Sequence, residues 1–166
     1  MKKFAMCATL LFLVTACGGD RISEVESVRR EIQAALDRST QATFNEDIEA
    51  YMAELPPDFT IKDESGEEIT REKQKENILR DWSVILRTLH LVQTVDSVRI
   101  NNGVAIVETS QRWEREMLRP DKSGTDIVLT TQRHRETWKQ HNGKWYGYDI
   151  VELGGEIFIN GQPYKP

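Results

Sequence analysis

Cysteine is scarce in this 166-residue sequence, and its absence from most of the chain excludes several kinds of chemistry. Both cysteines, Cys7 and Cys17, lie near the N-terminus, so the remainder has no disulfide, thiolate nucleophile or cysteine-ligated metal site. Only three histidines occur, His90, His134 and His141, and they lack ligand spacing with carboxylates, so we predict no metal site. The chain also has no Gly-rich phosphate loop and no Gly-x-Ser-x-Gly nucleophile elbow, and we predict no cofactor.

An excess of basic residues is missing as well. The formal net charge is −5, and it becomes −7 if Lys2 and Lys3 are removed with the N-terminal segment. Because nucleic-acid affinity comes largely from neutralising phosphates, this charge predicts no nucleic-acid partner. It also leaves no basic patch that could hold the protein on anionic lipid.

No apolar run reaches the roughly twenty residues that cross a bilayer. The uncharged stretch from Phe4 to Ala16 has thirteen residues and follows two lysines, which is typical of a signal peptide. Its end, Val14 to Cys17, resembles the lipobox of bacterial lipoproteins, in which the cysteine is acylated and becomes the new N-terminus. We therefore predict a signal peptide over residues 1–16 and an exported protein anchored to a membrane through lipidated Cys17. An ordinary secretory signal is the alternative. Gly18, in place of aspartate, predicts the outer membrane facing the periplasm if the cell is Gram-negative.

The following 150 residues have the size of one domain and begin with helical patterns. Ser23 and Glu26 form a capping box, which predicts a long helix starting at Ser23 and a short tether over residues 17–22. Asn45 can cap a second, short helix that Pro56 and Pro57 end, and Thr70 can cap a third.

From Leu89 onward the apolar period changes from about 3.6 to 2, which predicts four long antiparallel strands. Tight turns at Asn101–Gly103 and His141–Gly143 join two pairs of them. We expect Gly154 and Gly155 to end the fourth strand, with residues 153–166 as an additional hairpin. The pattern predicts an α+β fold, in which a curved antiparallel sheet wraps three N-terminal helices.

Three stretches carry a family resemblance: Asn45–Met52, Pro57–Asp63 and Thr137–Trp145. Their order and spacing resemble the nuclear transport factor 2-like superfamily, and within it the SnoaL-like branch, over residues 23–152. The resemblance implies a cone with a cavity at its wide end, and many members form dimers through the outer face of the sheet. Because the superfamily includes isomerases, dehydratases, hydrolases, carriers and adaptors, the function must be argued from particular residues.

Asp63 is one candidate, because ketosteroid isomerases of this superfamily keep a catalytic carboxylate at the end of the first strand. A carboxylate beside an apolar cavity can act as a general base. Those isomerases also use a tyrosine of the first helix, whereas this sequence has no tyrosine between residues 20 and 50, and the corresponding stretch lies near Arg38. The alternative, which we favour, is that Asp63 opens the turn that ends at Gly66.

A second group of candidates lies on the strands predicted at 104–116 and 127–140. On one face they alternate polar and apolar residues, including His134 and Glu136, which is unusual for a core and suits a ligand pocket. The predicted lining consists of Tyr51, Trp82, Thr109, Gln111, Trp113, Gln132 and His134. A solvated or dimer-forming sheet face is the alternative. We expect Trp138 and Trp145 to be packing residues.

These observations favour a lipid-anchored domain that binds a small apolar ligand or a protein partner without catalysis. One alternative is a lyase or isomerase that uses Asp63 or His134 as general base. That hypothesis requires a donor such as Tyr51, Gln111 or Trp113 close to the base. Another alternative is a dimeric scaffold.

Overall fold

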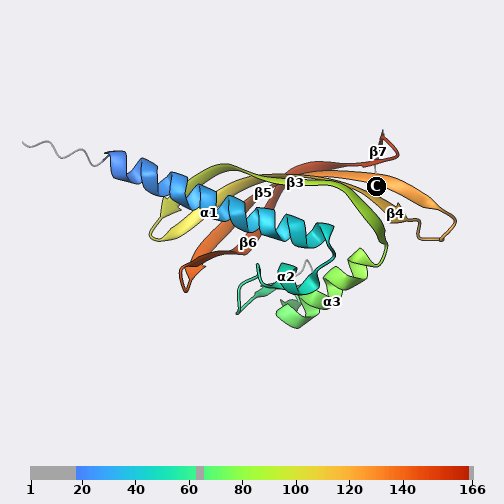
Figure 1. The fold of residues 1–166 in the computed structure, drawn as a ribbon, viewed down its shortest axis with the longest axis horizontal. Helices are drawn as coiled ribbons and strands as arrows, with labels where there is room; N and C mark the ends of the chain where they lie inside the picture. The colour runs from blue at the N-terminus through green and yellow to red at the C-terminus, as the bar shows by residue number, and fades with distance from the viewer. Residues whose placement is uncertain (1–17, 63–65, 165–166) are drawn as a thin grey trace, which may run out of the picture.

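The computed structural model describes residues 18–62 and 66–164, and in these ranges three helices pack against one face of a sheet (Figure 1). The predicted α+β class, with a curved antiparallel sheet and N-terminal helices, is confirmed. The elements in chain order are α1 (Gly18–Phe44), α2 (Ile48–Met52), β1 (Thr60–Lys62), β2 (Glu68–Thr70), α3 (Arg71–Trp82), β3 (Ile85–Asn101), β4 (Val104–Leu118), β5 (Thr125–His141), β6 (Lys144–Ile159) and β7 (Gln162–Pro163).

The long helix α1 begins at Gly18, so the predicted start at Ser23 was wrong. A capping box expresses a local preference worth about 1 kcal/mol, and no proline before Ser23 prevents the helix from continuing. Residues 18–22 are therefore helical and do not form an extended tether.

The five strands from β3 to β7 form one antiparallel sheet in which each strand pairs with the next. Asn102–Gly103, Asn142–Gly143 and Asn160–Gly161 all have positive φ angles near 50° and 77°, as two-residue hairpin turns require. The first two of these turns were predicted from the Asn-Gly pairs.

Strand β6 continues through Gly154 and Gly155, so the prediction that these glycines end the strand was wrong. The register shifts opposite them, between Arg133 and His134, and Gly154 has a φ of +129°. A Cβ atom on Gly155 would lie 2.1 Å from the carbonyl oxygen of Thr131. The glycines thus permit a bulge and a close approach between strands, and the C-terminal hairpin is an extension of β6.

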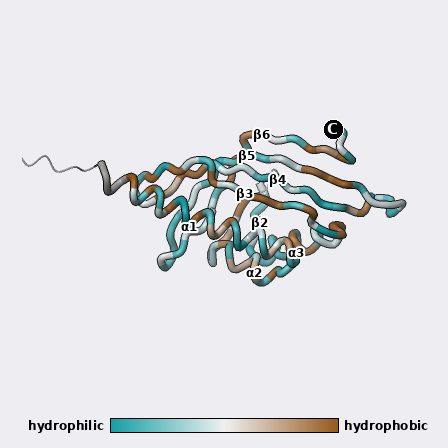
Figure 2. The backbone as a smooth tube through the Cα atoms, turned by 45° about the horizontal axis from the view of Figure 1, so that its top comes forward, coloured by the Kyte–Doolittle hydropathy of each residue, from teal (hydrophilic) through white to brown (hydrophobic). Residues whose placement is uncertain are grey.

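The core lies between α1 and the inner face of the sheet. One apolar stripe of α1, formed by Val28, Ile32, Ala35 and Leu36, packs against residues of β3, β4, β5 and β6 that include Val95, Val107, Trp138 and Trp145. A second cluster, Met52, Ile78, Trp82 and Ile85, joins α2 and α3 to the start of β3. Trp138 and Trp145 are both buried in the first cluster, as predicted for packing residues, and Trp138 also lines a cavity. Figure 2 shows apolar and polar residues intermixed along the strands, so the sheet is not uniformly apolar.

Candidate ligand-binding site

A cavity of about 260 Å³ lies between the helices and the inner face of the sheet. Its lining combines apolar and polar groups from all three helices and from strands β3, β4, β5 and β6. The lining residues are Ala35, Leu36, Ser39, Tyr51, Leu55, Phe59, Ile61, Gln74, Gln93, Gln111, His134, Glu136, Trp138, Gly147, Tyr148 and Ile150. A second cavity of about 230 Å³ shares Tyr51, Gln74, Gln93 and Gln111 with the first, so the two adjoin at these residues.

The structure brings together three residues of the predicted pocket, Tyr51, Gln111 and His134, in the first cavity. Trp82 and Trp113 line the second cavity. Thr109 and Gln132 line neither of them. Thr109 is buried and donates to Glu136, which lines the first cavity, and Gln132 accepts a hydrogen bond from the Gln111 amide at 3.3 Å.

Glu136 was placed on the inward face of its strand by the sequence pattern, but the predicted lining did not include it, nor did it include Ser39, Gln74, Gln93 or Tyr148. The Glu136 side chain is only 6% exposed, and it lines the first cavity beside His134. Thr109 Oγ1 donates to Glu136 Oε1, and Trp138 Nε1 donates to Glu136 Oε2, both at 2.7 Å. The signal in the sequence was a carboxylate at an inward-facing position of a strand, between His134 and Trp138. Such a group is normally excluded from a core unless it has partners.

Tyr51 is held at the junction of the two cavities by the short helix α2. Asp47 caps this helix by accepting a hydrogen bond from the Ala50 amide at 3.0 Å. The Tyr51 ring meets Trp82 edge-to-face, with ring centroids 5.8 Å apart and planes at 88°. Burial raises the pKa of the Tyr51 phenol, so the hydroxyl group remains a hydrogen-bond donor at neutral pH.

Solved structures share this arrangement of helices and sheet. A proposed scytalone dehydratase from Novosphingobium aromaticivorans has a TM-score of 0.61 at 12% identity, covering 80% of this chain and 89% of that one. A nuclear transport factor 2-like protein from Cytophaga hutchinsonii has a TM-score of 0.55 at 20% identity, covering 75% and 98%. A nuclear transport factor 2-like superfamily protein from Salmonella enterica serovar Typhimurium has a TM-score of 0.56 at 16% identity, covering 78% and 92%. The fold is that of the nuclear transport factor 2-like proteins.

The predicted superfamily resemblance is therefore confirmed at the level of the fold. No family model matches the sequence, and no curated protein matches it either. These three neighbours share at most a fifth of their residues with this chain, so the comparison establishes its fold. The function must be argued from the chain's own residues.

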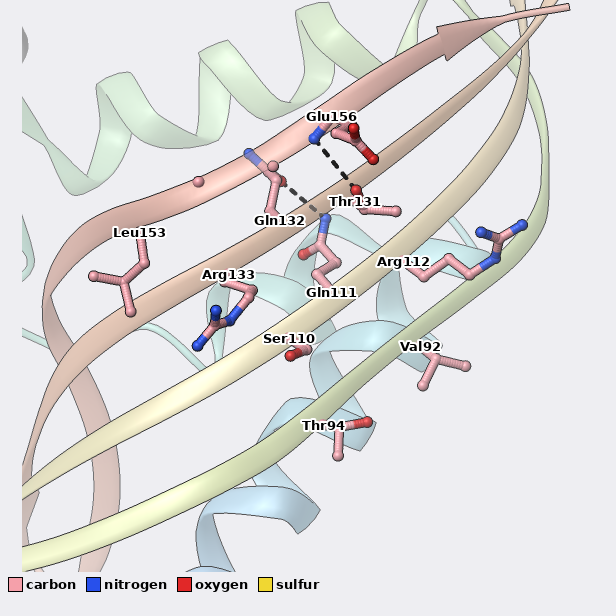
Figure 3. Close-up of a pocket in the computed structure, with 12 residues that line it drawn as sticks. Val92, Thr94, Ser110, Gln111, Arg112, Thr131, Gln132, Arg133, Leu153 and Glu156 are labelled. Carbon is pink, nitrogen blue, oxygen red and sulfur yellow. Dashed lines mark hydrogen bonds between the residues drawn. The ribbon is translucent and has the colours of Figure 1, made fainter. Parts of the chain in front are cut away.

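The nuclear transport factor 2-like sheet also has an outer face, which carries an open groove (Figure 3). In Figure 3 the helices lie behind the sheet, and side chains such as Val92, Ser110, Arg112 and Arg133 project from its other face. The groove follows the glycine bulge of β6, where Gly154 and Gly155 leave the backbone without side chains. A sheet face of this kind was the predicted dimer surface.

Two predicted residues, Asp63 and Cys17, lie outside the described residues. Within residues 18–62 and 66–164, no helix combines the length and the apolar character needed to cross a membrane. The same ranges contain no group of three or more histidine, cysteine or acidic side chains placed to hold a metal ion.

Proposed function

We propose that this chain binds a small, largely apolar molecule in the cavity between α1 and the sheet, without catalysis. The observation that carries the proposal is the pair of adjoining cavities at the position where a filled core would otherwise lie. Apolar groups such as Leu36, Phe59 and Trp138 supply contact area. Ser39 and the amides of Gln93 and Gln111 supply neutral hydrogen-bonding groups that orient a ligand.

Native mass spectrometry of the full chain, purified from its own envelope, tests this function. We expect a retained small molecule in the wild-type protein and its loss in Ser39→Phe, which places a bulky ring in the cavity. Arg30→Phe adds the same ring to an exposed position of α1 and should retain the molecule. Equal retention by both variants, or no retained molecule in the wild-type protein, contradicts the proposal.

We also propose that Cys17 is lipidated and anchors the domain to a membrane outside the cytoplasm, which would be the outer membrane in a Gram-negative cell. The support is the order of two lysines, an apolar stretch and a lipobox-like end. Cys17→Ser should release the protein from the membrane fraction, and Cys7→Ser should not. Membrane association that survives Cys17→Ser argues against the anchor.

A second candidate function is proton transfer of the lyase or isomerase type, which would place the chain with the SnoaL-like branch. It is favoured by His134, a potential general base, and Tyr51, a donor, on the wall of one cavity. An enzyme of this type should exchange a carbon-bound proton of the retained molecule with deuterated solvent, and His134→Gln should abolish the exchange. No exchange above the protein-free rate favours binding alone.

We also propose that the protein partner is a second copy of this chain, bound through the outer face of the sheet. Such a homodimer could serve as a structural scaffold. The exposed side chains of Val92 and Leu153 in the groove support it. Light scattering of protein lacking residues 1–17 should give a dimer, and Val92→Glu should give a monomer. A monomeric wild-type protein excludes this partner.

A further inference from the structure

The charge inside the first cavity has one sign. Its lining contains the buried carboxylate of Glu136 and, among the described residues, no lysine or arginine. The ion pairs of the described chain include none to Glu136 within 4.0 Å, whereas Glu54, Glu108 and Glu116 each pair with an arginine. Glu136 is therefore a carboxylate without a cationic partner.

Burying a carboxylate in this way is costly, because its hydration is lost without a compensating charge. The two contacts that Glu136 receives, from the Thr109 hydroxyl and the Trp138 indole, come from neutral donors. A carboxylate can accept about four hydrogen bonds, two on each oxygen. Since Glu136 is 94% buried and lines the cavity, the remaining acceptor capacity is available to a ligand there.

The walls around this carboxylate are rich in aromatic rings. Tyr51, Phe59, Trp138 and Tyr148 all line the same cavity, and the Tyr148 ring already has the ammonium group of Lys139 4.7 Å from its centroid. Aromatic faces attract cations through their quadrupole, and they also supply apolar contact to the body of a ligand. An anionic ligand would meet only repulsion from Glu136, while a neutral ligand would leave its charge uncompensated.

We infer that the ligand of this cavity is an apolar molecule bearing a protonated amine, which donates to the Glu136 carboxylate. The inference rests on the proposed binding function and adds the chemical class of the ligand. The protonated amine supplies the missing positive charge through a charge-assisted hydrogen bond to Glu136. The aromatic walls enclose the apolar part of the ligand. His134, on the same wall, is the one lining group that would oppose the amine when protonated.

Three probes with the same phenyl group and chain length test the inference: 3-phenylpropylamine, 3-phenylpropan-1-ol and 3-phenylpropanoate. Their binding is measured by calorimetry to the full chain in nanodiscs of zwitterionic lipid, with empty nanodiscs as the blank. We expect the amine to bind about tenfold or more tightly than the alcohol, and the carboxylate to bind weakest. In Glu136→Gln the amine should lose about tenfold in affinity, while the affinity for the alcohol changes little.

The outcomes distinguish failure of the amine inference from failure of the proposed binding function. Equal affinities for amine and alcohol, both abolished by Ser39→Phe, overturn the amine and uphold the binding function. A retained natural molecule that lacks an amine does the same. Failure of all three probes, with no retained molecule in the native mass spectrum, overturns both. If Glu136→Gln does not fold, as judged by circular dichroism, the ranking of the probes on the wild-type protein decides.

Discussion

At the scale of single residues, the hydroxyl group of Thr109 maintains the buried carboxylate of Glu136. Thr109 is 3% exposed, and its Oγ1 atom lies 2.7 Å from Glu136 Oε1. Thr109→Val keeps the shape of the side chain and removes the donor, so the carboxylate loses one of its two protein partners. We expect the free energy of unfolding to fall by about 1–3 kcal/mol, measured by urea denaturation.

Thr94→Val provides the matched control for this substitution. Thr94 lies on the exposed outer face of β3, so the same substitution there removes a hydroxyl group from a solvent-exposed position. We expect Thr94→Val to change the free energy of unfolding by no more than about 0.5 kcal/mol. If Thr109→Val is no more destabilising than Thr94→Val, the hydrogen bond does not maintain Glu136.

Glu54 gives a pH-dependent prediction at the same scale. Burial raises the pKa of this carboxyl group. Hydrogen bonds from Arg38 and Lys144 lower the pKa by more than burial raises it, so the net pKa lies below the ordinary 4.5. A lowered pKa in the folded state contributes stability that is complete above the unfolded value, and the contribution is lost as the pH falls through the folded value.

Glu54→Gln should therefore destabilise the protein at pH 7, and the difference from wild type should shrink as the pH falls below 4.5. Urea unfolding of both proteins at pH 7 and at pH 3 measures the difference at each pH. Glu49→Gln is the control, because Glu49 is exposed and forms a surface ion pair with Lys75. A difference that stays constant between the two pH values contradicts the role of the Glu54 carboxylate.

At the scale of elements, Arg71 joins α2 to α3 and thereby shapes the wall of the cavity that contains Tyr51. Arg71 Nη1 donates to the carbonyl oxygens of Leu55 and Pro56 at 3.0 Å, and Nη2 donates to that of Met52. Met52 is the last residue of α2, and Leu55 and Pro56 lie in the turns that follow it. The Met52 and Pro56 oxygens also accept from the Leu55 and Phe59 amides, so Arg71 adds a charged donor to carbonyls of these turns.

Arg71→Met should lower the free energy of unfolding by about 2–3 kcal/mol, because three carbonyls lose a charged donor. It should also weaken ligand binding, since α2 positions Tyr51. Arg80→Met is the matched control on α3, where an exposed pair with Asp81 contributes little. Equal stability of the two variants would show that Arg71 does not hold α2 in place.

The elements differ in how well the sequence predicted them. The α1 stripe and the Asn-Gly hairpins were predictable, because periodicity and turn chemistry act locally. The start of α1 was not, because a capping box is a weak local preference that does not prevent the helix from beginning earlier. The continuation of β6 through Gly154 was not, because strand pairing overrides the local glycine signal. The alternation along β5 placed His134 and Glu136 on the inner face. The contacts of Glu136 with Thr109, 27 residues away, and with the cavity depend on the register between β4 and β5.

At the scale of the whole molecule, the early start of α1 changes the geometry of the proposed anchor. With 27 residues, α1 is about 40 Å long, and its cavity-lining residues, Ala35 to Ser39, lie about 26–32 Å from Gly18 along the axis. A rigid helix that follows Cys17 directly would therefore hold the cavity away from the bilayer, whereas an extended tether would let the domain reorient.

Two turns at opposite ends of the sheet allow this orientation to be measured. The β3–β4 turn lies beside Glu24 and Val25 near the start of α1, and the β4–β5 turn lies at the far end of the molecule (Figure 1). Because the sequence has no cysteine after Cys17, Asn101→Cys and Pro120→Cys can each carry a single fluorophore. Spin-labelled lipid headgroups should quench the label at residue 101 more strongly than the label at 120. Cys17→Ser versions should show little quenching at either position, and equal quenching in the anchored proteins would mean that α1 lies flat on the membrane.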